Sequence, residues 1–256
     1  MIDKEKLKRR FSRNIESYDE YANVQKHMSK KLLSMVQIED GMNILEIGCG
    51  TGYLTKLILE KDKNVKITAV DIAPGMIEFC KKDKDLKLVD FFQGDIEKMD
   101  LNEEYDLIIS NATFQWFNHL EETLKKLKES LSKDGVLLFS TFGQDTFCEL
   151  RESYKKVSEK LEKKVSSPSP KFINKEVLDQ ILGKDNYTYQ EENFKEHFNN
   201  SVEFMKSVKK VGANNSSNTE ARADRKFLSK VIEYYDETYL EEDGVYATYN
   251  NLYIRV

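Results

Sequence analysis

One local pattern restricts the fold more than any other. The apolar run Asn43–Ile47 passes directly into the loop Gly48-Cys49-Gly50-Thr51-Gly52. The run predicts a buried strand, and the residues from Tyr53 to Glu60 predict a helix. Glycines allow a tight turn and let the backbone approach a ligand with no Cβ in the way. A strand, a glycine loop and a helix in this order are typical of a ligand site in an open α/β sheet.

Strand and helix patterns continue to alternate after this loop. The next predicted strands are Val65–Val70, Leu88–Phe92, Tyr105–Ser110 and Val136–Thr141. Helices are predicted from Pro74 to Lys82 and from His119 to Leu131, and proline suits the first turn of a helix. This alternation predicts a parallel sheet with helices on both faces.

The two ends of the chain do not follow this regular alternation of strands and helices. A helix is predicted from Asp19 to Val36, ahead of the first strand. Later helices are predicted at Gln144–Lys164, from Asn174 to Gly183, at Val202–Val211 and at Glu220–Leu240, with strands at Tyr187–Phe198 and Ala247–Val256. We therefore expect an α/β fold with a doubly wound, mostly parallel seven-stranded sheet and an α-helical cap over its carboxyl edge.

The expected organisation is one domain over residues 1–256. It comprises a helical segment (1–36), a cofactor-binding core (37–143), helical cap insertions interleaved with late strands (144–241) and a final strand (242–256).

Composition narrows the functional classes. The net charge of −5 argues against a general nucleic-acid partner. The three cysteines and three histidines are scattered, so we expect reduced thiols and no metal site. No apolar run is long enough to cross a membrane, and the charged start of the chain does not resemble a secretory signal. We expect a cytoplasmic monomer.

Basic residues gather in 1–13 and at Lys206, Lys209 and Lys210, where an acidic partner could bind or where a helix face is simply solvated.

The glycine spacing distinguishes two kinds of cofactor site. A dinucleotide fingerprint, GxGxxG, would need glycine at the position of Tyr53. Here the pattern is GxGxG, preceded by Glu46, which could hold the ammonium group of an amino-acid cofactor. Asp71 ends the second predicted strand, where its carboxylate could accept hydrogen bonds from both ribose hydroxyls. Glu46, Gly48, Cys49, Gly50, Gly52 and Asp71 are therefore the predicted centre of the site.

Further candidates follow later strands. Asp95 could bind an adenine amino group and Ile96 could cover the ring, with Ile72 and Met76 on its other face. For the three apolar residues, ordinary core packing is an equally good interpretation. Asn111 follows the fourth strand, at the edge where open α/β sheets bind ligands.

The glycine loop, Asp71 and Gly94-Asp95 resemble the class I S-adenosylmethionine-dependent methyltransferases. A wider set of motifs is similar to the malonyl-[acyl-carrier protein] O-methyltransferases of biotin synthesis. These motifs are Arg10-Phe11-Ser12-Arg13, Tyr18-Asp19 with Gln25, Ser110-Asn111, Phe114-Gln115-Trp116, Phe139-Ser140-Thr141-Phe142 with Thr146, Glu149-Leu150-Arg151, Gly212-Ala213-Asn214-Asn215, and Thr248-Tyr249 through Leu252-Tyr253. The chain departs from the family at Lys133-Asp134-Gly135, where Pro-Gly is usual, and matches it poorly over 157–199.

The resemblance implies S-adenosyl-L-methionine as cofactor and methylation of the free carboxylate of a malonyl thioester on acyl-carrier protein. A carboxylate is already ionised near neutral pH, so this chemistry needs no strong base. Arg151 could hold the carboxylate through two parallel hydrogen bonds, although a helix-surface arginine is an equal alternative. Tyr18 could close over the cofactor and Gln115 could line the substrate side. An acidic carrier would suit the two basic clusters.

Three alternatives remain open. The chain could methylate another small carboxylic acid or metabolite, because related folds serve many substrates. A nucleic-acid amino-methyltransferase is disfavoured, since Ser110-Asn111-Ala112-Thr113 replaces the usual Asn/Asp-Pro-Pro-aromatic motif. A cofactor-binding regulator without turnover is the third alternative, and a methyl-transfer assay distinguishes it from an enzyme.

Overall fold

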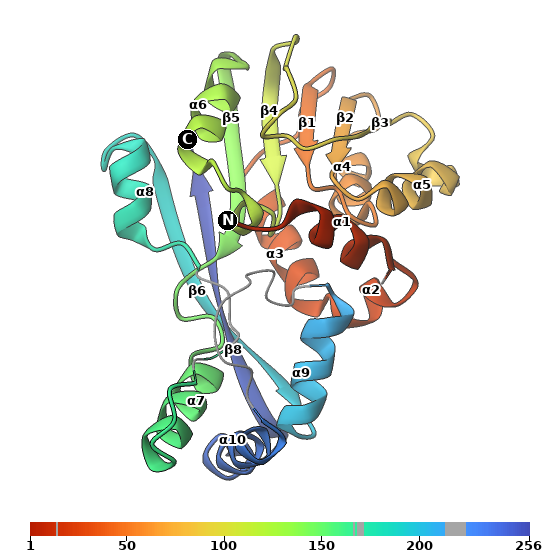
Figure 1. Cartoon of the computed structure of the whole chain (residues 1–256). Helices are drawn as coiled ribbons and strands as arrows, with labels where there is room; N and C mark the ends of the chain where they lie inside the picture. The colour runs from red at the N-terminus through yellow and green to blue at the C-terminus, as the bar shows by residue number, and fades with distance from the viewer. Residues whose placement is uncertain (14, 166, 168–171, 213–223) are drawn as a thin grey trace.

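A computed structural model describes residues 1–13, 15–165, 167, 172–212 and 224–256. It contains one mixed eight-stranded sheet (Figure 1). The strands along the sheet, in spatial order, are β3 (Asp90–Gln93), β2 (Lys66–Asp71), β1 (Asn43–Ile47), β4 (Tyr105–Ser110), β5 (Leu131–Phe142), β8 (Gly244–Arg255) and β6 (Thr188–Phe198), and the short β7 (Leu240–Glu241) pairs with β8.

The first five strands in this order run parallel, and β8 is antiparallel to both of its long neighbours. The chain reverses its direction of winding between β1 and β4, which are paired side by side. Ligands bind at the carboxyl ends of strands at such a point, because the helices leave in opposite directions and open a crevice. The predicted fold class is confirmed, including the seven predicted strands.

Alternation along the strands divides the core into two layers. Ile44 and Leu45 are neighbours on β1, yet they belong to different buried clusters, because successive strand side chains point to opposite faces. One face is covered by α3 (Asn23–Leu33), α4 (Tyr53–Lys61) and α5 (Pro74–Lys82). The other face is covered by α6 (Leu120–Glu129) and α8 (Lys175–Leu182).

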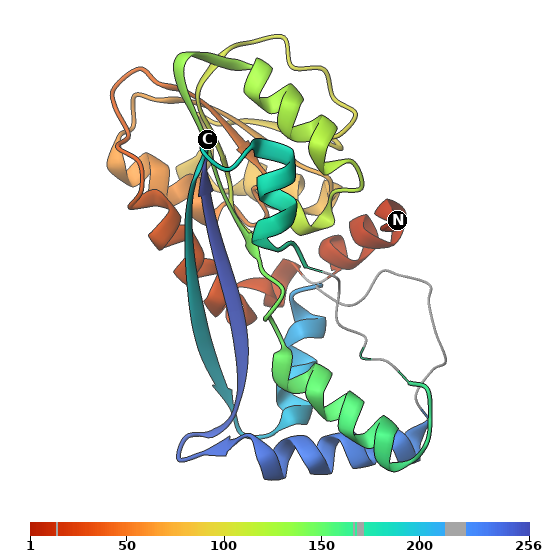
Figure 2. The same ribbon diagram turned by 90° about the vertical axis from the view of Figure 1, so that its left-hand side faces the viewer.

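The strands β6 and β8 form a long antiparallel hairpin that extends beyond the parallel strands (Figures 1 and 2). At its far end lie α7 (Cys148–Lys160), α9 (Ser201–Lys210) and α10 (Arg225–Thr238). Phe204, Phe227 and Tyr235 are fully buried there and tie the helices to the hairpin. This group extends the core cluster past the sheet edge.

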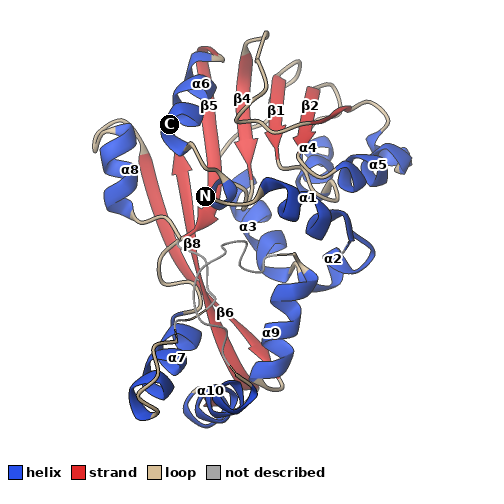
Figure 3. Ribbon diagram, viewed as in Figure 1, coloured by secondary structure: helices blue, strands red, loops and turns tan. Residues whose placement is uncertain are grey.

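Two short helices, α1 (Lys4–Arg13) and α2 (Ile15–Tyr21), cross the carboxyl edge of the parallel strands (Figure 3). The prediction of one helix from Asp19 to Val36 is wrong, because the chain bends at Ala22 before α3 begins. Alanine favours helix, so nothing local marks this break. The buried position of Ala22 and the contact of Asp19 with the glycine loop outweigh the propensity.

Two expectations for the cap are corrected. The helix α8 was expected in the cap, but Leu178 and Leu182 pack it onto the sheet face. The helix predicted from Gln144 begins at Cys148, because Phe147 before it has a positive φ of 60°. The predicted helix start at Glu220 and most of the predicted turn Gly212–Asn218 lie outside the described residues. No helix in the described ranges has the length and apolar character needed to cross a membrane.

Candidate active site

The glycine loop between β1 and α4 holds a conformation that few other residues could adopt. Gly48 and Gly52 have φ values of 73° and 80°, in the left-handed region. A Cβ on Gly48 would lie 2.1 Å from Oγ1 of Thr113, so a side chain there would clash. The backbone amides of Gly48 and Cys49 donate to the carbonyl of Val70 at 2.7 and 3.2 Å. The loop is thereby fastened to the end of β2.

Asp71 ends β2 and contacts the loop directly. Its Oδ2 accepts a hydrogen bond from the amide of Gly50 at 2.9 Å, and its Oδ1 accepts one from Ala73 at 2.8 Å. Burial raises the pKa of this carboxyl, although the two amide donors counteract the shift. The carboxylate is therefore oriented by the backbone.

Glu46 is 1% exposed, at the middle of the sheet. Its Oε2 accepts a hydrogen bond from Oγ1 of Thr55 at 2.6 Å. Burial raises the pKa of Glu46 to about 8, and the charge of Asp71 acts in the same direction. A ligand ammonium beside this carboxyl would supply the missing positive charge.

The carboxyl edge of the sheet is hollowed by a large pocket of about 650 Å³ that opens to solvent. Nine of the predicted site residues line it: Tyr18, Gly48, Gly50, Asp71, Ile72, Met76, Asp95, Ile96 and Asn111. A second space of about 390 Å³, which we call the loop pocket, includes Glu46 and Cys49 in its lining. Gly52 lines neither pocket and instead caps α4.

The loop pocket and the large pocket share four lining residues, Tyr18, Gly48, Gly50 and Asn111.

Hydrogen bonding with Cys80 and burial raise the pKa of the Cys49 thiol. Met76 and Ile96 are 1% and 4% exposed, so they serve the core as well as the pocket wall. In the described part of the chain, no group of three or more His, Cys, Asp or Glu residues could hold a metal ion.

The helix α1 supplies a wall that the sequence did not predict. Lys4, Leu7 and Phe11 line the large pocket. Lys4 Nζ lies 2.5 Å from Oε2 of Glu97 and 3.4 Å from Oδ1 of Asp95. The basic composition of residues 1–13 suggested an exposed face, whereas the i, i+4 spacing of Leu7 and Phe11 is the signal that could have revealed a packed one.

The helix α2 closes the same edge. Asp19 Oδ1 accepts a hydrogen bond from Thr51 Oγ1 at 2.8 Å, which joins α2 to the glycine loop. Burial, together with the charges of Asp71 and Asp19, raises the pKa of Tyr18. The phenol of Tyr18 thus lies near these two acids, at the junction of the large and loop pockets.

The polar residues after β4 are held in a hydrogen-bonded frame. Asn111 Nδ2 donates to the carbonyl of Gln25 at 2.9 Å, and Asn111 Oδ1 accepts from Ser140 Oγ at 2.6 Å. Gln115 Nε2 donates to the carbonyl of Ala112 at 2.6 Å, and Gln115 Oε1 accepts from Thr141 at 3.0 Å. Both amides are therefore fixed in orientation.

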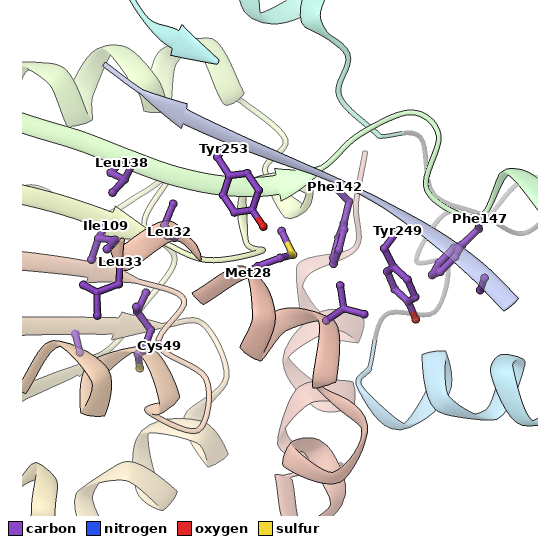
Figure 4. Close-up of a cluster of buried hydrophobic side chains, with 14 of the residues drawn as sticks. Met28, Leu32, Leu33, Cys49, Ile109, Leu138, Phe142, Phe147, Tyr249 and Tyr253 are labelled. Carbon is purple, nitrogen blue, oxygen red and sulfur yellow. The ribbon is translucent and has the colours of Figure 1, made fainter. Parts of the chain in front are cut away.

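A third space of about 360 Å³, the aromatic pocket, lies between β5, β8 and α9. Figure 4 shows Phe142, Tyr249 and Phe147 close together, near the carboxyl end of β5 and along β8. The ring of Tyr249 is 4.9 Å from that of Phe147 and 5.8 Å from that of Phe142. Trp116 lines both this pocket and the large pocket, and Gln25 lines both this pocket and the loop pocket. The three spaces are therefore adjacent to one another.

Arg151 is not brought to these pockets. Its guanidinium donates to the backbone carbonyls of Thr146 and Gln144. It lines none of the three pockets. Arg151 therefore supports the turn between β5 and α7, and its guanidinium does not reach the pockets where we expected it to hold the substrate carboxylate.

The fold has known counterparts among solved structures. The YcgJ protein of Bacillus subtilis superposes with a TM-score of 0.60 at 15% identity, over 90% of this chain and 97% of that one. Coclaurine N-methyltransferase bound to N-methylheliamine and SAH gives 0.53 at 19% identity, over 91% of this chain and 72% of that one. The open sheet with this glycine loop and buried acids near the ends of the first two strands is the fold of the class I S-adenosylmethionine-dependent methyltransferases.

Sequence comparison narrows the class. A family model described as a methyltransferase domain matches residues 38–199. A malonyl-[acyl-carrier protein] O-methyltransferase of Acetivibrio thermocellus is 45% identical, over 99% of this chain and 94% of its own length. One from Priestia megaterium is 42% identical, over 100% of this chain and 98% of its own length. The chain belongs to the malonyl-[acyl-carrier protein] O-methyltransferase family.

Proposed function

We propose that this enzyme methylates the free carboxylate of a malonyl group carried on acyl-carrier protein, an early step of biotin synthesis. The observation that carries the proposal is the 45% identity, over nearly the whole of both chains, to a relative of that name. The adjacency of the aromatic pocket to the two cofactor-side pockets supports it, because a methyl donor and an acyl acceptor must come into contact.

For the cofactor, we assign the adenosine part to the large pocket and the methionine part to the loop pocket. Asp71 would accept hydrogen bonds from the ribose and Glu46 would hold the amino group. Asp95 would bind the adenine amino group, with Ile72, Met76 and Ile96 against the ring and Asn111 at the junction. When bound, S-adenosylmethionine supplies a sulfonium methyl group, whose C–S bond breaks as the carboxylate oxygen forms the new C–O bond.

The protein's own contribution is alignment and exclusion of water. Because the acceptor carboxylate is ionised near neutral pH, no proton has to be removed before transfer. Phe142, Phe147 and Tyr249 provide an apolar wall that excludes water, and Tyr18 covers the cofactor side. Placing the carboxylate oxygen in line with the methyl carbon and the sulfur can supply a large part of the rate enhancement in such reactions.

The carrier would bind a composite basic surface. Lys206, Lys209 and Lys210 are exposed on α9. This helix packs beside α2, and Lys210 lies 5.9 Å from the ring of Tyr21. Phe11 of α1 lies against Gly212 at the end of α9. The two basic segments, distant in sequence, therefore lie near one another, where an acidic carrier would be attracted. We propose a cytoplasmic monomer.

The proposal is tested by incubating the protein with methyl-labelled S-adenosylmethionine and malonyl-, succinyl- or acetyl-loaded carrier. We expect a labelled methyl ester on the malonyl carrier and none on the acetyl carrier, which has no free carboxylate. Equal turnover of free small carboxylic acids would instead assign the enzyme to another metabolite. Absence of transfer from well-folded, cofactor-bound protein would reject the proposal.

A further inference from the structure

The polar side chains that line the aromatic pocket are all uncharged. They belong to Gln25, Gln115, Trp116, Thr146 and Tyr249. Three of them are already hydrogen bonded. The amide of Gln115 is held at both ends, Thr146 Oγ1 accepts from the amide of Asn250 at 3.0 Å, and the Tyr249 hydroxyl is hydrogen bonded to Glu196.

The other two carry uncommitted donors. Within the described part of the chain, the side-chain amide of Gln25 and the indole N–H of Trp116 donate to no other group. Trp116 is 8% exposed, and its ring meets the edge of Phe11 at 6.0 Å. Neither donor is among the sealed polar atoms of the described core, so both remain accessible from the pocket and are available to hydrogen bond a ligand there.

Both residues lie where the pockets join. Gln25 lines the aromatic and loop pockets, while Trp116 lines the aromatic and large pockets. Gln25 is in the first turn of α3, and its backbone carbonyl is held by Asn111 at 2.9 Å. The position of Gln25 is thus fixed relative to the end of β4, beside Asn111 at the junction of the large and loop pockets.

We propose that the Gln25 amide and the Trp116 indole N–H bind the acceptor carboxylate, a role that rests on the proposed function. Neutral donors suit this reaction better than an arginine. A paired guanidinium would stabilise the negative charge that must attack the methyl group, whereas neutral N–H groups orient the carboxylate and leave it more nucleophilic. Gln25 and Trp116 would thereby select acyl groups that end in a carboxylate.

The test measures binding and turnover together. With S-adenosylhomocysteine bound, affinities for malonyl- and acetyl-loaded carrier are compared in wild type, Gln25→Met, Gln25→Glu and Trp116→Phe. Methionine retains the length of glutamine and its helix propensity, and phenylalanine retains an aromatic ring. The matched control is Gln144→Met, the same change at an exposed position outside the pockets.

We expect Gln25→Met to lower kcat/KM for malonyl carrier by roughly 10- to 100-fold, mainly through KM, and to remove the preference for malonyl over acetyl carrier. Trp116→Phe should act in the same direction. Gln25→Glu should lower kcat/KM for malonyl carrier further than Gln25→Met does, because its carboxylate would repel the acceptor carboxylate. Affinity for S-adenosylhomocysteine should change by less than about twofold, and Gln144→Met should resemble wild type.

Two outcomes would overturn the inference. Equal loss of affinity for malonyl and acetyl carriers would make Gln25 a structural residue. Weaker S-adenosylhomocysteine binding with an intact malonyl preference would assign it to the cofactor. Wild-type protein that fails to methylate malonyl carrier would reject the proposed function itself, which is a separate result.

Discussion

At the scale of single residues, Glu46 has the most consequential environment. It is buried with a neutral partner, Thr55, so its raised pKa of about 8 means that the unbound protein holds a proton there at pH 7. The folded pKa lies above the usual value of 4.5. This group therefore makes the unbound protein most stable below about pH 4.5, and that contribution is lost progressively as the pH rises to about 8.

We expect cofactor binding to release this proton. A ligand ammonium next to Glu46 would lower its pKa, so binding of S-adenosylhomocysteine at pH 7 should release up to about one proton per site. Calorimetry in buffers of different ionisation enthalpy measures the release. Glu46→Gln should abolish it and weaken binding. A binding enthalpy that is independent of buffer in the wild type would contradict the assignment of Glu46 to the ammonium group.

At the scale of elements, the turn from β5 into α7 shows how a charged residue outside a pocket can shape it by holding the turn that lines it. It carries Thr146 and Phe147, which line the aromatic pocket, and Phe147 adopts a φ of 60° that is unfavourable for a bulky side chain. The Arg151 guanidinium bonds to two carbonyls of the same turn. The arginine thus holds the pocket wall in place.

For Arg151→Ala we expect a loss of about 1–3 kcal/mol in unfolding free energy and a higher KM for malonyl carrier, with unchanged S-adenosylhomocysteine affinity. Arg151→Lys should recover only part of the stability, because a lysine has no planar fork of donors. Urea denaturation and steady-state kinetics measure both effects. An Arg151→Ala variant with wild-type stability but no turnover would instead indicate that Arg151 binds the substrate carboxylate.

The ion pairs of Lys4 are the second feature at this scale, because they join α1 to the loop after β3. Lys4→Met removes the cation that pairs with Glu97 and Asp95 and joins them to α1, so α1 should cover the large pocket less often. We expect S-adenosylhomocysteine to bind about 5- to 10-fold more weakly by calorimetry. The control is Lys8→Met, whose partner Glu5 is exposed, and which should bind normally. Equal affinities of the two variants for S-adenosylhomocysteine would show that α1 does not contribute to the cofactor site.

At the scale of the whole molecule, the basic surface of α1 and α9 exists only because two segments far apart in the sequence fold side by side. We expect Lys206→Glu, Lys209→Glu and Lys210→Glu in combination to weaken carrier binding at least tenfold and to reduce its dependence on salt. Turnover of a small malonyl thioester without carrier should be retained. Lys125→Glu with Lys128→Glu on α6 is the matched control. Equal losses with and without the carrier would refute the docking surface.

The sequence by itself determined the parallel strands, the glycine loop and the positions of Asp71 and Asp95. These features follow from local patterns: apolar runs, glycine spacing and acids that directly follow strands. Parallel strands end at one edge, so residues after different strands are brought together without further information. That is why most of the predicted cofactor residues line joined pockets.

Only the tertiary structure decided the rest of the site. The bend at Ala22, the inward position of Lys4, the backbone contacts of Arg151 and the uncommitted amide of Gln25 all depend on partners far away in the sequence. A side chain's propensity and charge are local properties, whereas its burial and its hydrogen-bond partners are properties of the packed chain. Most of the cofactor side was therefore readable from the sequence, whereas on the acceptor side only Gln115 was predicted and the remaining residues required the fold.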